Sequence, residues 1–277
     1  MKAIIVGAGL SGLLSAYLLK DRFDVAVYES RSGLNLTAPA FWLFRYIPNV
    51  SINEQKLLGI LPSNKEQYLQ KVYGKVVPAT FRWENAKVST VWDYNLDEIV
   101  PKVLPFIQFN TKMTKVKLYE KVIELERNGK VFEDRYDLLI STVPFSVLAK
   151  CLNININLEC VPIGVKIERV KLDTDVNTQI YISDICVSAY RITYVAQSKT
   201  IYAEYSLFNP FNRYKKYDMV MMPGRVLRNK DVEKYIPFLE ENGIYLLGRY
   251  ARWNPDFLVE NSCDYIQTKI LKEARNE

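Results

Sequence analysis

The chain has 277 residues, of which 49% are hydrophobic and 25% are charged, and it contains no histidine. This composition is ordinary for a globular protein that buries a sizeable core. The absence of histidine excludes Ser-His-Asp and Cys-His nucleophile arrangements and argues against a transition-metal site. Proton transfer must then use lysine, tyrosine, acidic residues, water or a cofactor. The net charge of +6 is spread along the chain, which leaves open either attraction to an anionic substrate or polymer, or no specific role.

The cysteines and the apolar segments limit the class further. The 4 cysteines form no C-x-x-C pair, so neither a zinc site nor a dithiol redox motif is expected. We expect Cys186 and Cys263 to be buried thiols, because their neighbours are apolar. No segment approaches the roughly 20 consecutive apolar residues of a membrane span. The first residues resemble a strand and a phosphate loop rather than a signal peptide, so a cytoplasmic protein is the simplest expectation.

The N-terminal stretch has the pattern of a strand, a glycine-rich turn and a helix. Residues 3–6 are a short apolar run, typical of a strand buried on both faces. Three glycines follow with the spacing G-x-G-x-x-G: Gly7, Gly9 and Gly12. Small and apolar residues then recur at helical spacing over 13–19. A second apolar strand, 25–28, ends on Glu29, which completes the context of a dinucleotide-binding turn.

The chemistry of this motif explains each residue type. Gly7 allows a tight turn, Gly9 leaves room for a pyrophosphate and Gly12 lets the helix pack close to the strand. The free N–H groups at the start of the helix then face the phosphates. Glu29 can accept hydrogen bonds from a ribose diol. We therefore predict cofactor contacts from these residues: Gly7, Ala8, Gly9, Leu10, Ser11, Gly12 and Glu29.

The sequence from Glu29 to Gly33 resembles the start of FAD-binding domains in the amine oxidase, protoporphyrinogen oxidase and UDP-galactopyranose mutase superfamily. That family usually has two adjacent glycines, whereas Leu34 follows Gly33 here. The resemblance favours FAD over NAD and implies further cofactor contacts from Ser30 and Arg31.

Residues 36–103 are expected to form a block over the cofactor. Phe41, Trp42 and Phe44 either pack in a core or run toward the flavin ring, and Arg45 is a weaker candidate for a phosphate or substrate contact. Local patterns predict two short helices over 52–60 and 64–72, a strand over 80–83 and another helix over 95–103.

The stretch that follows is expected to return to the cofactor. Residues 106–116 are predicted as strand, and Asn128-Gly129 predicts a hairpin with a type I′ turn. A buried strand over 136–144 and a helix from 145 come next. This order resembles the family's second cofactor segment, which implies contacts near Met113, through its backbone, and at Thr142 and Pro144. A meander without a ligand is the alternative.

Four strand-like segments predict a second, substrate-facing antiparallel sheet: 165–172, 179–182, 187–195 and 200–207. Tyr190 to Thr193 resembles a tyrosine-arginine strand of the mutase and porphyrinogen-oxidase branch. The resemblance makes Arg191 a catalytic candidate that contacts a substrate anion or the flavin; a half-exposed surface arginine is the alternative. Residues 219–225 are an apolar run predicted to end in a turn, and 231–239 a short helix or an extended link.

The C-terminal stretch combines a strand over 244–247, a glycine turn and a helix over 257–272. The Gly-Arg-Tyr-x-x-Trp spelling from Gly248 to Trp253 resembles the last cofactor segment of the same branch. The resemblance implies cofactor contacts at Gly248, Arg249, Trp253 and Phe257, and it makes Tyr250 the second catalytic candidate. A simple junction of strand and helix is the alternative.

Together these segments predict an α/β fold with a Rossmann-like FAD-binding domain (1–35, 104–150 and 220–277). A small inserted cap domain with an antiparallel sheet takes the remainder (36–103 and 151–219). The resemblance implies an FAD-dependent oxidoreductase, most like an amine oxidase, in which hydride passes from a C–H next to nitrogen to flavin N5 and oxygen reoxidises the ring. A redox-neutral sugar mutase and a non-catalytic flavin-binding module are the alternatives. The expected substrate is an amine, free or attached to a polymer; an anionic substrate such as a nucleotide or nucleic acid stays open, and no metal is expected.

Overall fold

A computed structural model describes residues 1–36, 45–77, 88–210, 212–214 and 216–273. The aromatic residues at 41, 42 and 44 and the strand predicted over 80–83 lie outside this range. The chain divides into two compact units. The parallel-sheet unit comprises Met1–Leu36, Asn95–Glu159 and Leu227–Glu277, and the mixed-sheet unit comprises Thr37–Tyr94 and Cys160–Val226. Three of these boundaries lie several residues from those expected at 103/104, 150/151 and 219/220.

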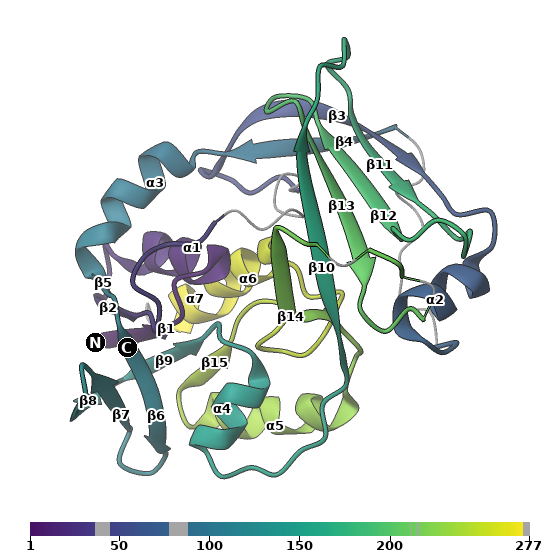
Figure 1. The fold of residues 1–277 in the computed structure, drawn as a ribbon. Coiled ribbons are helices and arrows are strands. Elements are labelled where there is room, and N and C mark those ends of the chain that lie inside the picture. The colour runs from purple at the N-terminus through teal and green to yellow at the C-terminus, as the bar shows by residue number, and fades with distance from the viewer. Residues whose placement is uncertain (37–44, 78–87, 211, 215, 274–277) are drawn as a thin grey trace. The chain divides into compact units, whose positions relative to one another are not determined.

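The parallel-sheet unit is built on five parallel strands in the order β15-β9-β1-β2-β5 (Figure 1). β1 and β9 are buried along almost their whole length, as expected for strands covered on both faces. The strands predicted in these regions are confirmed, although β5 has only two residues and is half-buried. Their bounds are Lys2–Val6 for β1, Asp24–Tyr28 for β2, Ile107–Gln108 for β5, Leu138–Ser141 for β9 and Ile244–Leu246 for β15.

Helix α1, Leu10–Leu19, connects β1 to β2 and packs against both strands, against α3 and against α6. Most of the apolar side chains predicted at helical spacing are buried, namely Leu13, Leu14, Ala16 and Leu19. The predicted C-terminal helix consists of consecutive pieces, with a π-helical segment between two α-helical ones. The remaining helices of the unit are α3 (Leu96–Val103), the 3₁₀ turn η2 (Leu104–Phe106), α4 (Phe145–Cys151), α5 (Lys230–Glu241), α6 (Val259–Tyr265), η3 (Ile266–Ile270) and α7 (Leu271–Glu273).

A separate three-stranded antiparallel sheet, β6-β7-β8, belongs to the same unit. Its strands are β6 (Thr111–Lys117), β7 (Val122–Arg127) and β8 (Lys130–Arg135). Asn128 and Gly129 join β7 to β8 with φ angles of 52° and 75°. Two consecutive positive φ values are those of a type I′ turn, so the hairpin prediction is confirmed.

The mixed-sheet unit contains seven strands in the order β14-β10-β13-β12-β11-β3-β4. Every neighbouring pair is antiparallel except β11 and β3, which are parallel. The expected antiparallel sheet is therefore present within a larger mixed one. Its strands are β3 (Ser51–Ile60), β4 (Val88–Tyr94), β10 (Cys160–Arg169), β11 (Asn177–Tyr181), β12 (Arg191–Val195), β13 (Thr200–Ser206) and β14 (Met219–Val226).

Three predictions made from local sequence patterns in this unit are wrong. Residues 52–60, predicted as a helix, form β3, because β4 and β11 supply hydrogen-bonding partners on both of its edges. Residues 219–225, predicted to end in a turn, form the edge strand β14. Cys186, expected to be buried, is exposed, because it lies in the turn between β11 and β12 rather than in a strand. The helix predicted over 64–72 is confirmed as α2 (Lys65–Tyr73).

Candidate cofactor-binding site

Four segments with predicted cofactor contacts meet at one edge of the parallel sheet, because each follows a strand of that sheet. Gly7 follows β1, Glu29 follows β2, Thr142 follows β9 and Gly248 comes shortly after β15. β1 lies between β2 and β9, and both neighbours are parallel to it. The connection that follows β1 leads to β2 on one side of β1, and a later part of the chain returns to the sheet as β9 on the other side. Open α/β sheets bind ligands at such a switch point, outside the carboxyl ends of the strands.

The turn after β1 is held by close packing of backbone on backbone. Gly7 has φ +97°, and its N–H donates to the carbonyl of Tyr28 at 2.8 Å. The Thr142 hydroxyl lies 3.0 Å from the carbonyl oxygens of both Val6 and Gly7. A Cβ on Gly12 would lie 1.9 Å from the Gly7 oxygen. Gly12 therefore allows the helix to pack against the turn, as the sequence predicted, and Thr142 stabilises that turn from β9.

The start of α1 has the properties of an anion-binding helix terminus. Gly9 is the N-cap, no side chain caps the helix and its first turn holds no acidic residue. A Cβ on Gly9 would meet nothing within 4 Å, so the backbone faces open space there. The first N–H groups of a helix lack partners within the helix and carry partial positive charge. The residues therefore fit a bound diphosphate.

Glu29 is an ionised acceptor at the end of β2. Its carboxylate is buried; one oxygen accepts from the Ala8 N–H at 2.8 Å, and the Arg31 guanidinium binds both oxygens at 2.9 Å. Burial alone would raise the pKa of Glu29, but the hydrogen bonds from Arg31 and Ala8 hold it below its usual value. The Ser30 hydroxyl lies 3.4 Å from the same carboxylate. The Arg31 side chain is 45% exposed, so one side of its ion pair with Glu29 faces solvent.

The segment after β15 lies directly against the start of α1. Gly248 has φ +98°, and a Cβ there would lie 2.8 Å from the Ser11 hydroxyl oxygen. Arg249 and Tyr250 come next and are partly exposed. The Tyr250 carbonyl accepts from the N–H of Phe145, the first residue of α4, at 2.9 Å. The tertiary structure thus brings the C-terminal segment to the glycine turn, and a cofactor held by one would lie beside the other.

The remaining predicted cofactor residues also lie in the parallel-sheet unit, and most of them are buried or bonded within the protein. Leu10 is buried in the first turn of α1, and Pro144 is the N-cap of α4. Met113 is buried in β6; its carbonyl accepts from the Cys151 thiol at 3.6 Å. Trp253 is buried, and its indole N–H donates to the Glu159 carbonyl at 3.1 Å.

Phe257, the last of the predicted cofactor residues, packs against an arginine of its own unit. The Arg252 guanidinium lies 4.2 Å from the centre of its ring. One face of the Phe257 ring is therefore covered by Arg252, just as the indole N–H of Trp253 is bonded to Glu159. Contacts within the protein therefore account for both aromatic side chains in the structure.

The two catalytic candidates lie in different units, Tyr250 in the parallel-sheet unit and Arg191 in the mixed-sheet unit. Arg191 is not a surface residue: its side chain is 9% exposed and pairs with Glu204. Glu204 and Arg225, which also contact each other, were not predicted as site residues. For Glu204 the sequence held a signal, because this acid lies two residues after Tyr202 and therefore on the same, buried face of β13.

Lys71 of α2 is a second buried charge that the sequence did not reveal. Its ammonium group donates to the carbonyl oxygens of Ile182, Asp184 and Ala189. Burial lowers the pKa of Lys71 to about 8. Three carbonyl acceptors match the three donors of the ammonium group, so this lysine ties α2 to the turn between β11 and β12.

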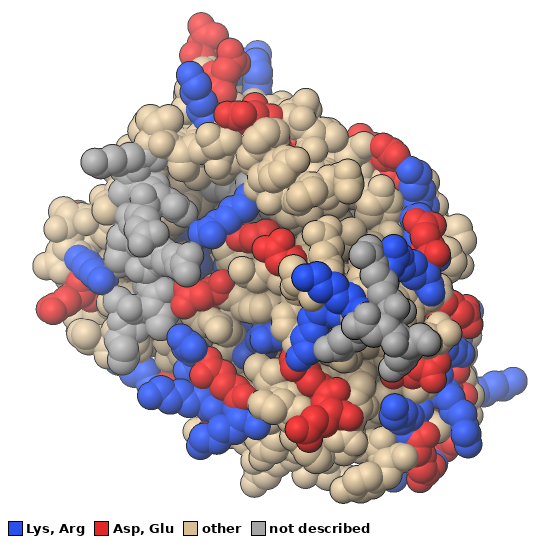
Figure 2. Space-filling view, turned by 180° about the vertical axis from the view of Figure 1, so that it is seen from behind, with Lys and Arg blue, Asp and Glu red and all other residues tan. Residues whose placement is uncertain are grey.

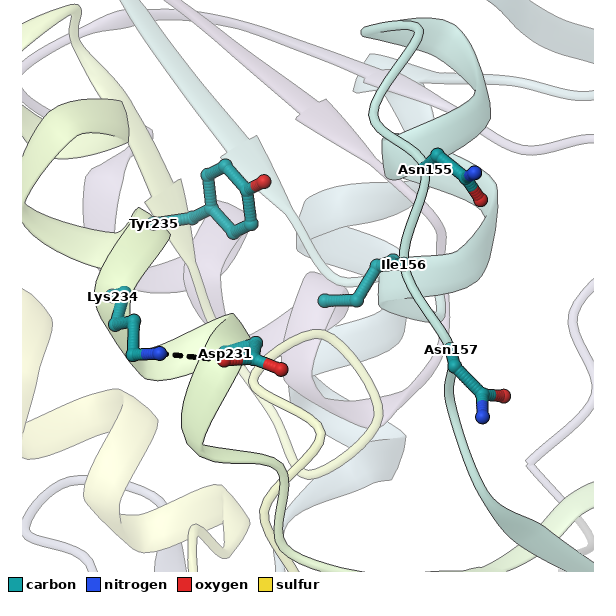
Figure 3. A pocket seen from close by; sticks show the side chains of 6 residues that line it. All are labelled: Asn155, Ile156, Asn157, Asp231, Lys234 and Tyr235. Atoms are coloured by element: carbon teal, nitrogen blue, oxygen red, sulfur yellow. Dashed lines mark hydrogen bonds and ion pairs between the residues drawn. The ribbon is translucent and has the colours of Figure 1, made fainter.

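An open pocket of about 510 Å³ lies in the parallel-sheet unit, between α5 and the segment that follows α4 (Figure 3). Tyr235 and Ile156 point toward each other across it, and Asp231 pairs with Lys234 at 2.7 Å. The pocket contains none of the sequence-predicted site residues. Among the described residues, no group of three or more cysteine or acidic residues is placed to hold a metal ion.

Charges of both signs are interspersed on the surface drawn in Figure 2. Ion pairs also form between partly exposed charges of the chain, such as Lys102 with Glu98 and Arg228 with Glu233. The face in Figure 2 therefore shows no single-sign field of the kind that steers nucleic acids. Within the described ranges, no helix is both long and apolar enough to cross a bilayer.

Comparisons with known proteins agree with this geometry. Residues 5–41 match the model of an NAD(P)-binding Rossmann-like domain. The FAD-binding monooxygenase tazF of Aspergillus terreus is 29% identical over 152 residues, covering 51% of this chain and 24% of that protein. A KsdD-like steroid dehydrogenase of Mycobacterium tuberculosis is 41% identical over 64 residues, covering 23% of this chain and 11% of that protein. The chain thus spans no more than about a quarter of the length of these curated relatives.

Solved structures resemble the chain over nearly its whole length. Reduced UDP-galactopyranose mutase covers 96% of this chain and 95% of its own, with a TM-score of 0.62 and 16% identity. An oxidoreductase from Methanosarcina mazei covers 98% and 100%, with a TM-score of 0.64 and 12% identity. The chain has the fold of the NAD(P)/FAD-binding Rossmann flavoprotein superfamily. The expected α/β fold, and the resemblance from which it was drawn, are confirmed at this level.

Proposed function

We propose that the chain binds FAD at the edge of its parallel sheet and acts as an FAD-dependent oxidoreductase. One observation carries the proposal: the uncapped start of α1, the buried Glu29 carboxylate and Gly248 all meet at the switch point of the sheet. The printed names of the curated relatives, a monooxygenase and a dehydrogenase, support a redox function.

Different residues at this edge of the sheet would contact different parts of the cofactor. The N–H groups of Leu10, Ser11 and Gly12 bind the diphosphate, since they begin α1 and no side chain caps it. Glu29 accepts hydrogen bonds from the adenosine ribose once Arg31 has moved aside. The segment from Gly248 to Tyr250 continues toward the flavin end. FAD bound there would supply the two-electron redox chemistry.

The protein's own contribution is binding, orientation and control of protons. With no histidine in the chain, a carboxylate, a tyrosine, a lysine, water or the cofactor must take any proton that the substrate loses. Tyr250 is the candidate for that role at this edge, because it is partly exposed and its backbone is fixed to α4. A fixed backbone holds the side chain in a restricted orientation, which is what catalysis by positioning requires.

Within this class we propose amine-oxidase-like chemistry. The substrate would lose a hydride from a C–H next to nitrogen and become an iminium ion. Oxygen would take up the two electrons with that hydrogen and one proton from water to give hydrogen peroxide, so two electrons are transferred in all. The proposal rests on the spelling of two segments, Glu29 to Gly33 and Gly248 to Trp253. The substrate is an amine, free or attached to a polymer.

The visible spectrum of the purified protein tests the cofactor, and anaerobic mixing tests the chemistry. We expect oxidised-flavin bands, or their appearance when FAD is added to a colourless preparation. Bleaching by an amine, with oxygen uptake on re-aeration, supports an amine oxidase. Rearrangement of a nucleotide sugar without oxygen uptake identifies a mutase instead. Protein that stays colourless after incubation with FAD and removal of the unbound flavin refutes the proposal.

A further inference from the structure

Two arginines share one carboxylate in the interior of the mixed-sheet unit. Arg191 on β12 stands directly opposite Glu204 on β13, and its Nε and Nη2 bind the two carboxylate oxygens. Arg225 reaches the same carboxylate from β14, with Nη2 3.3 Å from Glu204 Oε2. The Tyr190 hydroxyl donates to Glu204 Oε2 at 2.7 Å and accepts from Arg225 Nε at 3.2 Å. We call these four residues the arginine cluster.

The arginine cluster carries an excess positive charge. Two guanidinium groups contribute +2 and one carboxylate contributes −1, which leaves +1. Among the residues that the structure describes, neither arginine forms an ion pair with any acid other than Glu204. The three charged side chains are only 5 to 12% exposed. A buried charge without a partner is costly, because water no longer solvates it.

The two arginines are held unequally. Arg191 makes a two-pronged bond to Glu204, whereas Arg225 makes one longer bond to it and lies 5.5 Å from the centre of the Tyr190 ring. Within the described part of the chain, the Nη1 group of each arginine has no hydrogen-bond acceptor. The excess charge therefore resides mainly on Arg225, because Arg225 contacts the carboxylate through one long bond and Arg191 through two short ones.

We propose that the arginine cluster binds a carboxylate group of the substrate, with Arg225 as the principal ligand. A carboxylate brings one negative charge, which neutralises the excess of one. Its planar pair of oxygens matches the parallel donors of a guanidinium group. A phosphate monoester would bring −1.5 to −2 charges, roughly, and would leave the cluster negative. This inference rests on the proposed function, because the bound carboxylate belongs to a substrate only if the chain is an enzyme.

Anion binding by the purified protein tests the proposal with and without FAD, so that its failure is separate from a failure of flavin binding. The probes are sodium benzoate and sodium acetate, compared with sodium phosphate and sodium chloride at equal ionic strength. Calorimetry or ligand-observed NMR measures the dissociation constants. We expect saturable carboxylate binding and at least tenfold weaker phosphate binding. Equal binding of phosphate, or no saturable carboxylate binding, would overturn the assignment.

Variants locate the site. Arg225→Met removes the excess charge, and we expect it to fold and to bind benzoate at least tenfold more weakly. Arg228→Met is the matched control, because it removes an exposed arginine three residues away that pairs with Glu233; its benzoate affinity should equal that of the unmodified protein. Should Arg225→Met not fold, Arg225→Lys takes its place, since lysine keeps the charge but not the fork, and weaker benzoate binding is again expected. Unchanged benzoate affinity in a folded Arg225 variant overturns the proposal.

Discussion

Two glycines of the same turn should respond oppositely to the same substitution. Gly12→Ala places a methyl group 1.9 Å from the Gly7 oxygen, far inside contact distance, and that oxygen is held by the Thr142 hydroxyl. The turn and helix must separate, and overpacking of this kind costs about 1–3 kcal/mol. Gly9→Ala meets nothing within 4 Å, and its φ of −72° suits alanine. Its effect on stability should stay within about 1 kcal/mol, the cost of alanine at an N-cap.

For FAD affinity we expect the reverse order, with the larger effect from Gly9→Ala. The methyl group of Gly9→Ala would occupy the open space in which the diphosphate approaches the backbone. Losing about 1.4 kcal/mol of that contact weakens binding tenfold, and we expect at least this for FAD. Thermal unfolding without FAD reports the first effect, where Gly12→Ala should lower the midpoint by on the order of 5 °C. Titration of FAD, followed by flavin fluorescence, reports the second.

The paired design separates packing from binding. Gly9→Ala that binds FAD as tightly as the unmodified protein would show that the start of α1 is not the diphosphate site. Gly12→Ala that unfolds at the unmodified temperature would show that the helix does not pack on the turn as closely as the structure places it. Either result refutes the reasoning from these contacts.

Three further predictions concern single side chains. Glu29→Gln should weaken FAD binding by tenfold or more in the same titration, because the ionised acceptor for the ribose is lost; unchanged affinity would place the ribose elsewhere. Burial opposes ionisation of Glu204, but two guanidinium groups lower its pKa to about 2. Its folded pKa thus lies below the unfolded value, so its contribution of roughly 3 kcal/mol is present above about pH 4.5 and is lost toward pH 2. Urea unfolding from pH 6 to 3 should show a smaller loss in Glu204→Gln, which is also less stable at pH 6. Native protein treated with iodoacetamide should label Cys186, which is exposed, and not Cys263, whose pKa burial raises to about 12; mass spectrometry that finds Cys263 labelled first would contradict the burial.

The glycine turn could be predicted from sequence because its determinants are local. Gly7, Gly12 and Glu29 lie within one strand-helix-strand unit, and short-range packing fixes their geometry. The turn at Asn128-Gly129 was predictable for the same reason, since two residues decide its backbone angles. For β3, by contrast, the local pattern favoured a helix, and the pairing with distant strands decided otherwise.

The sequence by itself therefore determined the glycine turn, the parallel strands around it and the α/β class. Only the tertiary structure decided that Gly248 lies against Ser11, more than 200 residues earlier in the chain. It also decided that Arg225 joins Arg191 on one carboxylate. Spacing along the chain carries no information about such contacts, because they form between strands that become neighbours only after folding. The charges of the arginine cluster lie in the interior of the mixed-sheet unit, where an unpaired charge costs free energy. Their pairing is therefore a property of the folded chain.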